Sequence, residues 1–481
     1  MNKRSLLAAL CVASALLAAQ TLTAESTKDP KPGKKKSANP KETGNQSFNN
    51  PVVAVEPFAD VKARDEGEKA KFFDRQQALL AARYELGDNP SPVKMSGGKK
   101  YVQQGVRVKL PAGATWESLA KLTPQEIKDR DLFPAGFLPL PHVKHAAGGQ
   151  VFPKVQIDGI NAAEARSLQR FDTDFDLPDH LTPEFPAPIF LQNRPELGDV
   201  SQGKLLTTKN FFDIFNGKLT PVQLDGLRQL LTPFPQAEFN MTDSRKVDPP
   251  QLGVTCLDCH SNFHTNAAFH LNPDTRPQVN RFRLDTPSLR GVFNQQIHGS
   301  KRSLRSIEDF TEFEQRTAYF NGDQVDAARK GVNLPDRSSQ VALMAQVQNM
   351  IDFPPAPKLL ADGSGRLDPA QATEAEKLGE QVFFGKGKCA LCHKPDTFMD
   401  DKMHDQHLER FFKPKEISDQ LINGDGPMKT FTLRGIKDSP PYLHDGRLLT
   451  LEDTVEFFNL VLGTNLEAKE KEGLVAYMRQ L

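Results

Sequence analysis

The stretches "CLDCH" at residues 256–260 and "CALCH" at residues 389–393 repeat one pattern, Cys-x-x-Cys-His, 133 residues apart. This pattern is the attachment signature of c-type haem. Two thiols at this spacing form thioethers with the vinyl groups on one edge of a porphyrin, and the next imidazole ligates the iron. The sequence therefore predicts two covalently bound haems c. The predicted attachment and ligand residues are Cys256, Cys259 and His260, and Cys389, Cys392 and His393.

Other uses of paired cysteines fit the two motifs less well. The ligands of a zinc site surround one ion, whereas these pairs are far apart in the chain and each is followed by its own histidine. A redox-active dithiol needs no histidine at that position and favours a thioredoxin-like setting. Of the five cysteines, only Cys11 lies outside the motifs, in an apolar N-terminal run. No cysteine is then left for a structural disulfide.

The N-terminus predicts export. Lys3 and Arg4 precede an apolar run over 6–19, and small residues follow, the pattern of a cleaved signal peptide at 1–24. The mature protein is therefore expected in the periplasm. Residues 25–50 carry six lysines and one large apolar residue, so we expect a disordered linker there. The rest of the chain has no apolar stretch long enough to span a membrane.

The charge balance argues against a nucleic-acid partner. The chain has 61 basic and 61 acidic residues, so its formal net charge is zero. A strong single-sign field, which would favour nucleic acid or an anionic membrane, is absent from the composition.

An internal repeat begins at residue 219. The matching segments are "LTPVQ" (219–223) and "LDPAQ" (367–371), "TPSLRGV" (286–292) and "TFTLRGI" (430–436), and "SIEDFTEF" (306–313) and "TLEDTVEF" (450–457). In the first pair, Thr or Asp before Pro predicts the start of a helix that leads to each motif. Two homologous, mainly α-helical haem domains at 219–360 and 361–481 are the simplest interpretation.

Residues 51–218 form an N-terminal extension of unknown role. Helical spacing predicts a helix over 66–86, and the alternation of Val106, Val108 and Leu110 predicts a short strand. Frequent prolines between 133 and 200 indicate an irregular, extended segment.

The second axial ligand of each iron decides whether that iron is closed or open to small molecules. His264 follows His260 by four residues, and a helical rise of about 6 Å would keep it on the proximal side. We therefore expect His264 to be solvated or near a propionate. The remaining ligand candidates are His270 for the first haem and Met403 and His404 for the second. Each of these could instead pack as an ordinary structural residue.

Two arginines and two further histidines recur near the matching segments. Arg290 and Arg434 occupy the two Leu-Arg-Gly motifs, and a guanidinium pairs well with a haem propionate. An ordinary surface ion pair is the alternative role for each. His298 and His444 lie on the turns that follow and are the remaining site candidates, with His444 predicted to bind the cofactor.

The segments "AEKLGEQVFFGKGKCALCH" (375–393) and "PPYLHDGRLLTLEDTVEFF" (440–458) resemble the bacterial dihaem cytochrome c peroxidase family. The family includes relatives that mature quinone cofactors in other enzymes. The resemblance covers roughly 219–481 and implies two facing cytochrome c-like domains. It also implies that the C-terminal haem takes electrons from a small periplasmic donor, a c-type cytochrome or a cupredoxin. The N-terminal haem would reduce hydrogen peroxide.

The chain departs from this family at several positions. Family members place a Met or Tyr iron ligand where Phe457 and Phe458 stand here, so Met403, His404 or no residue replaces it. The tryptophan expected near His298 is missing, since Trp116 is the single tryptophan. A distal glutamate is expected after that turn, and Glu312 or Glu314 could supply it. The predicted catalytic residues are His270, His298 and Glu312. A calcium ion between the haem domains, found in part of the family, stays open.

The leading hypothesis is a periplasmic dihaem oxidoreductase that is peroxidase-like. A non-catalytic electron-transfer cytochrome is the first alternative, favoured by the two phenylalanines and the missing tryptophan. Oxidation of an organic or protein substrate held by the extension is the second.

Overall fold

The structure is a computed structural model, and it describes residues 58–140, 149–166, 168, 177–233, 255–271, 283–300, 304–314, 337–417 and 420–481. All of these belong to the unit Thr43–Leu481. The expected signal peptide at 1–24 and linker at 25–50 lie outside the described residues. Among the described helices, none has the length and apolar character needed to cross a bilayer.

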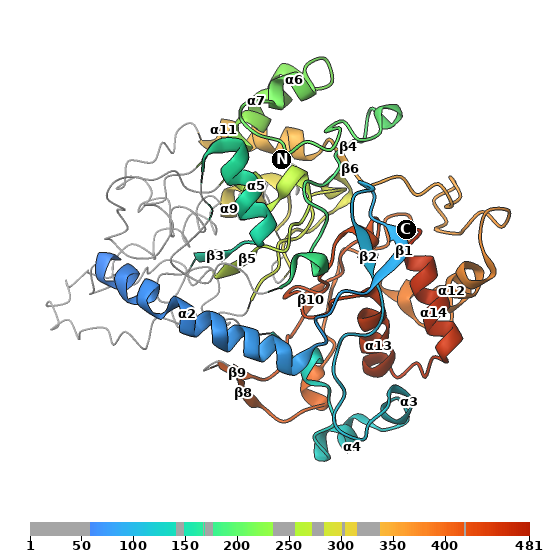
Figure 1. Ribbon diagram of the computed structural model, residues 1–481. Coiled ribbons are helices and arrows are strands. Elements are labelled where there is room, and N and C mark those ends of the chain that lie inside the picture. The colour runs from blue at the N-terminus through green and yellow to red at the C-terminus, as the bar shows by residue number, and fades with distance from the viewer. Residues whose placement is uncertain are drawn as a thin grey trace, which may run out of the picture. The chain divides into compact units, whose positions relative to one another are not determined.

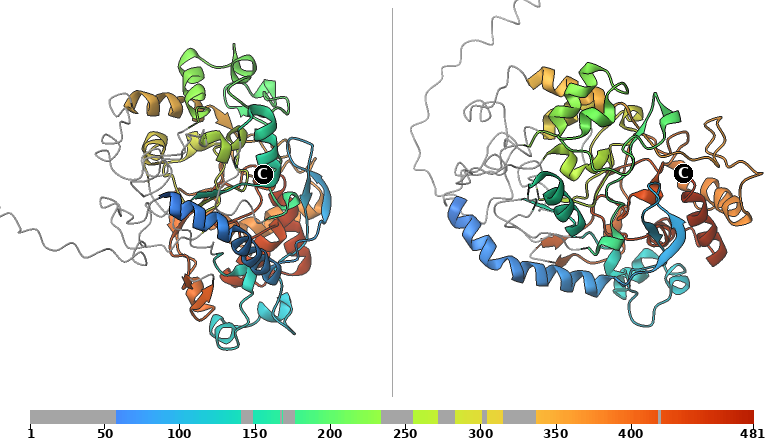
Figure 2. Two further views of the ribbon diagram at one scale, coloured as in Figure 1. Left: turned by 60° about the vertical axis from the view of Figure 1, so that its left-hand side comes forward. Right: turned by 45° about the horizontal axis from the view of Figure 1, so that its top comes forward.

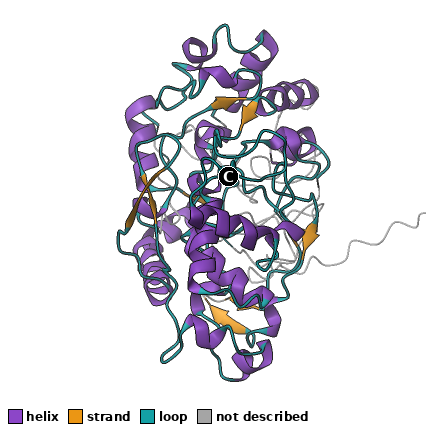
Figure 3. Ribbon diagram, turned by 90° about the vertical axis from the view of Figure 1, so that its right-hand side faces the viewer, coloured by secondary structure: helices purple, strands orange, loops and turns teal. Residues whose placement is uncertain are grey.

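The described chain is mainly helical, as the sequence predicts (Figure 1). The α-helices are α2 (Phe58–Arg83), α3 (Trp116–Leu119), α4 (Pro124–Asp129), α5 (Lys154–Glu164), α6 (Phe211–Phe215), α7 (Pro221–Leu230), α8 (Cys256–Cys259), α9 (Ile307–Glu314), α11 (Arg337–Gln348), α12 (Glu374–Phe384), α13 (Leu451–Leu462) and α14 (Ala468–Met478). Long loops connect them, and the strands are short (Figure 3).

The described strands form antiparallel pairs rather than a central sheet. The pairs are β1 (Pro90–Lys94) with β2 (Tyr101–Gln103), β3 (Gly149–Val151) with β5 (Phe269–Leu271), β4 (Phe190–Leu191) with β6 (Ile351–Asp352), β7 (Met403–His404) with β10 (Met428–Lys429), and β8 (Lys415–Ile417) with β9 (Gln420–Ile422). Two of them, β3–β5 and β4–β6, join the N-terminal extension to residues beyond 219.

Each attachment motif is preceded by a helix that packs closely on a later one. Helix α7 packs on α11, and α12 packs on α14, and the partners lie side by side in Figures 1 and 2. A Cβ at Gly226 of α7 would lie 1.9 Å from the Leu343 carbonyl oxygen, and one at Gly379 of α12 would lie 1.8 Å from that of Gly473. Only glycine therefore permits these backbone approaches.

The predicted helix start at Thr220 is confirmed, whereas the one at Asp368 is wrong. The Thr220 side chain caps α7, with Pro221 in the first turn. The second helix begins five residues later than predicted, at Glu374, and its cap is Thr373. Asp368 instead closes a turn, because its carboxylate accepts hydrogen bonds from the Ala370 backbone N–H (2.9 Å) and the Gln371 side chain (2.7 Å).

The two Leu-Arg-Gly segments share one backbone course. In each, the glycine has a positive φ (+72° at Gly291 and +69° at Gly435) and precedes a 3₁₀ turn. A β-bridge follows, between His298 and Leu304 in the first segment and between Tyr442 and Leu448 in the second. His298 thus corresponds in position to Tyr442 and not to His444. Helices α9 and α13 come next.

The N-terminal extension contributes to both hydrophobic cores. One core combines Leu80, Val108 and Phe137 with residues near the C-terminus such as Phe457. The Phe137 and Phe457 rings meet edge to face at a centroid distance of 5.2 Å. The other core combines residues of the extension such as Leu191 with α7, the first motif and α11. The extension is therefore built into both motif-bearing regions.

The predicted helix in the extension is confirmed, whereas the predicted strand is wrong. Helix α2 covers most of 66–86. At 106–110 the chain makes only an isolated bridge, between Val108 and Tyr84. The Arg107 and Val108 N–H groups donate to the carboxylate of Asp453 at 2.8 and 3.1 Å. A buried side chain thus takes donors that a strand partner would use.

Candidate functional site

The second motif begins on a 3₁₀ turn, Cys389–Leu391, that follows α12. The turn starts from Lys388, whose φ is +61°, and the His393 N–H donates to the Cys389 carbonyl at 2.9 Å. Cys389 and Cys392 are half-buried free thiols. The local structure thus leaves both thiols and the histidine available for attachment chemistry.

His393 has the tautomer that a metal ligand needs. Its Nδ1 lies 2.9 Å from the Phe398 carbonyl oxygen. Because a carbonyl can only accept, Nδ1 carries the proton and Nε2 is an unprotonated acceptor. Burial lowers the pKa of the ring, which keeps it neutral. A backbone carbonyl on the other ring nitrogen is the usual way to orient a metal-ligating histidine.

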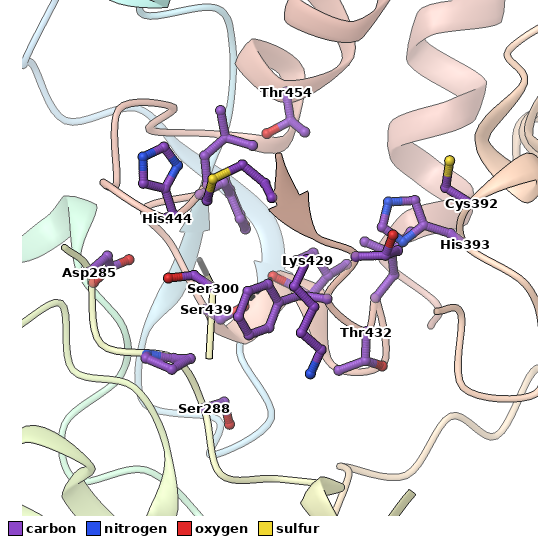
Figure 4. Close-up of a pocket in the computed structure, with 18 of the residues that line it drawn as sticks. Asp285, Ser288, Ser300, Cys392, His393, Lys429, Thr432, Ser439, His444 and Thr454 are labelled. Atoms are coloured by element: carbon purple, nitrogen blue, oxygen red, sulfur yellow. Dashed lines mark hydrogen bonds between the residues drawn. The ribbon is translucent and has the colours of Figure 1, made fainter. Parts of the chain in front are cut away.

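A cavity of about 330 Å³ lies beside His393 and Cys392 (Figure 4). Helix α13 lines it with Leu451, Thr454, Phe457, Phe458 and Leu462. The volume lies within the range of cofactor sites, roughly 300–1,000 Å³. In the view of Figure 4, His393 and His444 lie at opposite sides of the cavity. An apolar wall next to two thiols and an acceptor imidazole fits the attachment of haem c.

Arg290 and Arg434 both line this cavity. Each has a buried Nε without a hydrogen-bond partner in the described part of the chain, which suits an anionic group such as a propionate. Arg290 also pairs with Asp438 (3.2 Å) and donates to the Pro188 carbonyl (2.6 Å). Arg434 donates to the Pro354 carbonyl (3.1 Å). Both arginines therefore lie at the cavity, as the binding of haem propionates would require, and this role stays a prediction.

The first motif lies on a short capped helix, α8. The Thr255 side chain accepts from the Asp258 N–H, and the Asp258 carboxylate accepts from the Thr255 N–H (2.7 Å). Cys259 is buried. Burial, together with the charges of Glu314 and Asp258, raises the pKa of the Cys256 thiol to about 12. The Cys256 thiol is therefore protonated at neutral pH.

The N-terminal extension clamps the first motif through Asp258. The two carboxylate oxygens of Asp258 accept hydrogen bonds from the two terminal nitrogens of Arg166 at 2.8 Å each, and both side chains are buried. Glu164 holds the same guanidinium at 2.7 Å. The Asp258 carbonyl accepts from Gln156 and Asn266. This clamp was not predicted, because nothing local marks Arg166 as the partner of a residue 92 positions away.

His264 is buried, so the expectation of a solvated side chain is wrong. Its Nδ1 lies 2.8 Å from the Ser288 hydroxyl, and its Nε2 lies 2.9 Å from the Asp438 carbonyl oxygen. Burial and the nearby charge of Arg290 lower the pKa of the ring well below its usual value. His264 also lines the cavity beside His393.

The ligand candidates of the second haem differ in placement. His404 lines the cavity, but its Nε2 lies 2.8 Å from the Asp400 carboxylate. The ligand atoms of Cys392, Asp400 and His404 lie within 4.8 Å of one another, so His404 sits beside the attachment thiol. Met403 is paired with Lys429 in the β7–β10 ladder and is not among the cavity-lining residues.

The candidates of the first haem are spread over several elements. His270 lies in β5 opposite Gln150. Glu312 is half-buried on α9, while the charge of Glu314, on the same helix, acts on Cys256. His298 is buried, and burial together with Lys429 lowers its pKa to about 4. The described contacts do not bring His298 and Glu312 together.

His444 lines the polar end of the cavity. Its Nε2 lies 3.5 Å from the Asp425 carboxylate, and its carbonyl accepts from the Asp285 N–H at 2.7 Å. Asp425 and Asp445 offer oxygens near this imidazole. Arg447 already pairs with both carboxylates, so this cluster does not fit a calcium ion.

Lys429 is a cavity residue that the sequence did not reveal. Its side chain is buried, donates to Gln295 and lies over the Phe431 ring at 5.0 Å (Figure 4). Burial lowers its pKa to about 8. Lysine at a strand end carries no local signal of this position.

Comparison with known proteins agrees with the motifs. No family model matches the chain. The chain is 26% identical over 151 residues to cytochrome-c peroxidase IdrP2 of Denitromonas iodatirespirans, covering 24% of this chain and 41% of the relative. It is 33% identical over 89 residues to the methylamine utilization protein MauG of Methylorubrum extorquens, covering 17% and 24%. The matches thus span less than half of either relative. The predicted resemblance to the dihaem cytochrome c peroxidase and MauG family is confirmed at low identity.

A MauG-like protein associated with microbial copper homeostasis is among the structural neighbours. The match has a TM-score of 0.31 and 19% sequence identity, and it covers 41% of this chain and 73% of the neighbour.

Proposed function

We propose that the protein is a dihaem c-type cytochrome that acts as a peroxidase-like oxidoreductase. It would take electrons one at a time from a small periplasmic donor, a c-type cytochrome or a cupredoxin, and reduce hydrogen peroxide to water. The names of its relatives, cytochrome-c peroxidase and MauG, support an oxidoreductase of this class. Export through the predicted signal peptide at 1–24 is part of the same proposal.

The observation that carries the proposal is the geometry around His393. The ring presents an unprotonated Nε2, and the cavity beside it has an apolar helix face and buried guanidinium groups. When bound, haem supplies an iron that exchanges single electrons and binds small oxidants. Cys389 and Cys392 would hold the macrocycle, His393 would ligate the iron, and Arg434 would neutralise a propionate. The α13 face would exclude water from one side.

The same proposal includes a second haem at Cys256, Cys259 and His260. Its support is the common order of elements in the two regions: a capped helix with a close-approach glycine, the motif, the Leu-Arg-Gly turn, a β-bridge and a final helix. In the described structure the capped helices match at Thr220 and Thr373 rather than at the predicted Asp368. This common order supports an internal duplication with haem domains at 219–360 and 361–481.

The division of labour follows the family resemblance. The haem at His260 would react with peroxide, assisted by His270, His298 or Glu312, and the haem at His393 would receive electrons. The proposal places no calcium ion at the cluster near His444, because the Asp425 and Asp445 carboxylates already pair with Arg447.

The test is the optical and EPR spectrum of the purified holoprotein, oxidised and half-reduced, with and without hydrogen peroxide. We expect two haems per chain and a high-spin haem that reacts with peroxide. Two low-spin haems indifferent to peroxide would instead identify an electron-transfer cytochrome. Consumption of peroxide only when an organic or protein reductant is present would identify oxidation of such a substrate.

A further inference from the structure

One histidine joins the two motif-bearing regions directly. His264 lies four residues after His260, and its side chain forms part of the wall of the cavity beside His393. It is 2% exposed. Among the described residues that line this cavity, His264 is the nearest in sequence to His260. His264 is therefore a contact point between the two sites.

The hydrogen bonds of His264 fix its tautomer and its direction. The Asp438 carbonyl can only accept, so Nε2 carries the proton and donates across the junction at 2.9 Å. Nδ1 then accepts from the Ser288 hydroxyl at 2.8 Å, within the first region. One ring nitrogen thus faces each side of the junction.

The receiving residue, Asp438, is held from three directions. Its backbone is in the 3₁₀ turn Ile436–Asp438 that follows Gly435. Its carboxylate accepts from Arg290 at 3.2 Å and from the Ser96 N–H at 2.9 Å. The carbonyl that meets His264 is therefore part of a rigid, buried junction.

The contact continues from this turn to His393. Thr432, two residues before Arg434, accepts the Arg434 N–H at 3.0 Å and donates to the Thr397 carbonyl at 2.6 Å. The next carbonyl, that of Phe398, accepts from His393 Nδ1 at 2.9 Å. Short backbone segments and hydrogen bonds therefore connect the His264 imidazole to the predicted ligand of the second iron.

We propose that the His264–Asp438 hydrogen bond is the bridge through which an electron passes between the two attachment sites. The inference rests on the proposed presence of two haems. In each transfer the iron at His393 loses one electron and the iron at His260 gains one, and His264 keeps its Nε2 proton. His264 would be a positioning residue, since its hydrogen bond places the two regions in electronic contact.

Arg290 offers a second contact across the same junction, through the Asp438 carboxylate rather than its carbonyl. Both His264 variants below leave this ion pair in place, so a difference between their transfer rates reports the contact with the Asp438 carbonyl.

The experiment compares His264→Asn with His264→Gln in the holoprotein. The Asn amide reaches as far as Nδ1 and keeps the Ser288 contact, whereas the Gln amide reaches as far as Nε2 and keeps the donor toward Asp438. Both replacements are polar and smaller than or similar to histidine, so both can be accommodated. The measurement is the rate of electron transfer between the haems after photochemical injection of one electron. Haem stoichiometry and both reduction potentials are measured on the same samples.

We expect His264→Asn to slow the transfer by about tenfold or more, equivalent to about 1.4 kcal/mol in barrier, and His264→Gln to stay near the parent rate. Unchanged potentials and spectra separate this effect from a general loss of structure. Equal rates in the Asn and Gln variants, whether slow or fast, would overturn the bridge. A single haem per chain in the parent protein would overturn the two-haem proposal itself, which is a different failure.

Discussion

The two Cys-x-x-Cys-His motifs have the same pattern but are held in opposite ways. The first is a capped helix whose second variable residue, Asp258, is buried and clamped by Arg166 from the N-terminal extension. The second is a 3₁₀ turn whose second variable residue, Leu391, is 69% exposed. The surroundings of a motif, rather than its letters, therefore decide how firmly it is fixed.

The largest expected effect is the loss of the clamp at the first motif. Arg166→Met leaves two buried carboxylates, of Asp258 and Glu164, without their cation, and breaking a buried pair costs about 3–5 kcal/mol. We expect the free energy of unfolding to fall by that amount and the haem content to drop toward one per chain, with the second motif still loaded. Denaturant unfolding and a haemochrome assay measure both.

The control for the clamp is Arg194→Ala, which removes an exposed ion pair with Glu196. Such pairs contribute about 0–1 kcal/mol. The two motifs would not differ in how firmly they are held if Arg166→Met lowers the free energy of unfolding no more than Arg194→Ala does. The same conclusion would follow if Arg166→Met lowers the haem content of both motifs equally.

The next effect tests a feature in which the two regions are alike. Gly226→Ala and Gly379→Ala each force a Cβ into a carbonyl oxygen of the partner helix, and overpacking of this kind costs about 1–3 kcal/mol or more. Gly67→Ala in α2, where a Cβ meets nothing within 4 Å, is the control and gains up to about 1 kcal/mol from helix propensity. Thermal unfolding of the three variants checks this. If Gly226→Ala or Gly379→Ala leaves the unfolding temperature unchanged, the two regions do not share this dependence on a closely packed glycine.

One part of the acid sensitivity should come from His298, in the first region. Burial lowers the pKa of His298 to about 4, so the unfolded chain binds this proton first, and stability falls as the pH drops from 6.5 toward 4. The loss should be about 1–3 kcal/mol. The second region has Tyr442 at the corresponding place, which does not ionise in this range. We expect His298→Tyr to remove that part of the acid sensitivity, measured as the difference in the free energy of urea unfolding between pH 7 and pH 4.5. The same difference in the variant and in the parent protein would contradict the prediction.

The smallest change in stability, about 1 kcal/mol, is expected for Phe458→Met on the cavity face of α13. The resemblance to the dihaem peroxidase family predicts an iron ligand in the neighbourhood of Phe457 and Phe458. The thioether should therefore bind the second iron and convert its EPR signal to low spin, leaving the first haem as it was. Leu462→Met, one turn farther along the same face, is the control. If the second haem of the parent protein is already low-spin, and replacing His404 or Met403 abolishes that low-spin signal, then one of these residues already serves as the iron ligand.

Short-range signals in the sequence predicted the elements that depend on short-range chemistry. The motifs, the Thr220 cap and the helix in the extension depend on residues a few positions apart. The Asp368 error arose because Asp before Pro suits a turn as well as a helix start. The strand at 106–110 failed because Asp453 takes its backbone donors from a distance of 346 residues.

The candidate site was predictable only in part for the same reason. Cys389, Cys392 and His393 follow from the motif and Arg434 from the repeat, and all four line one cavity. His444 lines it as well, although the residue that corresponds to His298 in the repeat is Tyr442. The roles of Arg166 and Lys429 depend on contacts between distant segments, and no pattern in the sequence predicts those contacts. The burial of His264 was not predicted because a four-residue spacing says nothing of the Asp438 carbonyl, and its place near a propionate stays a prediction.

The shared cores have a consequence for how the chain is made. Residues around Leu80 and Phe137 leave the ribosome early, yet the side chains that cover them, such as Phe457, arrive near the end of synthesis. Contacts of such long range must wait for the whole chain and are slow to form. A nascent chain therefore carries exposed apolar segments until its last helices appear. We expect it to depend on a chaperone for longer than a protein whose first third folds by itself.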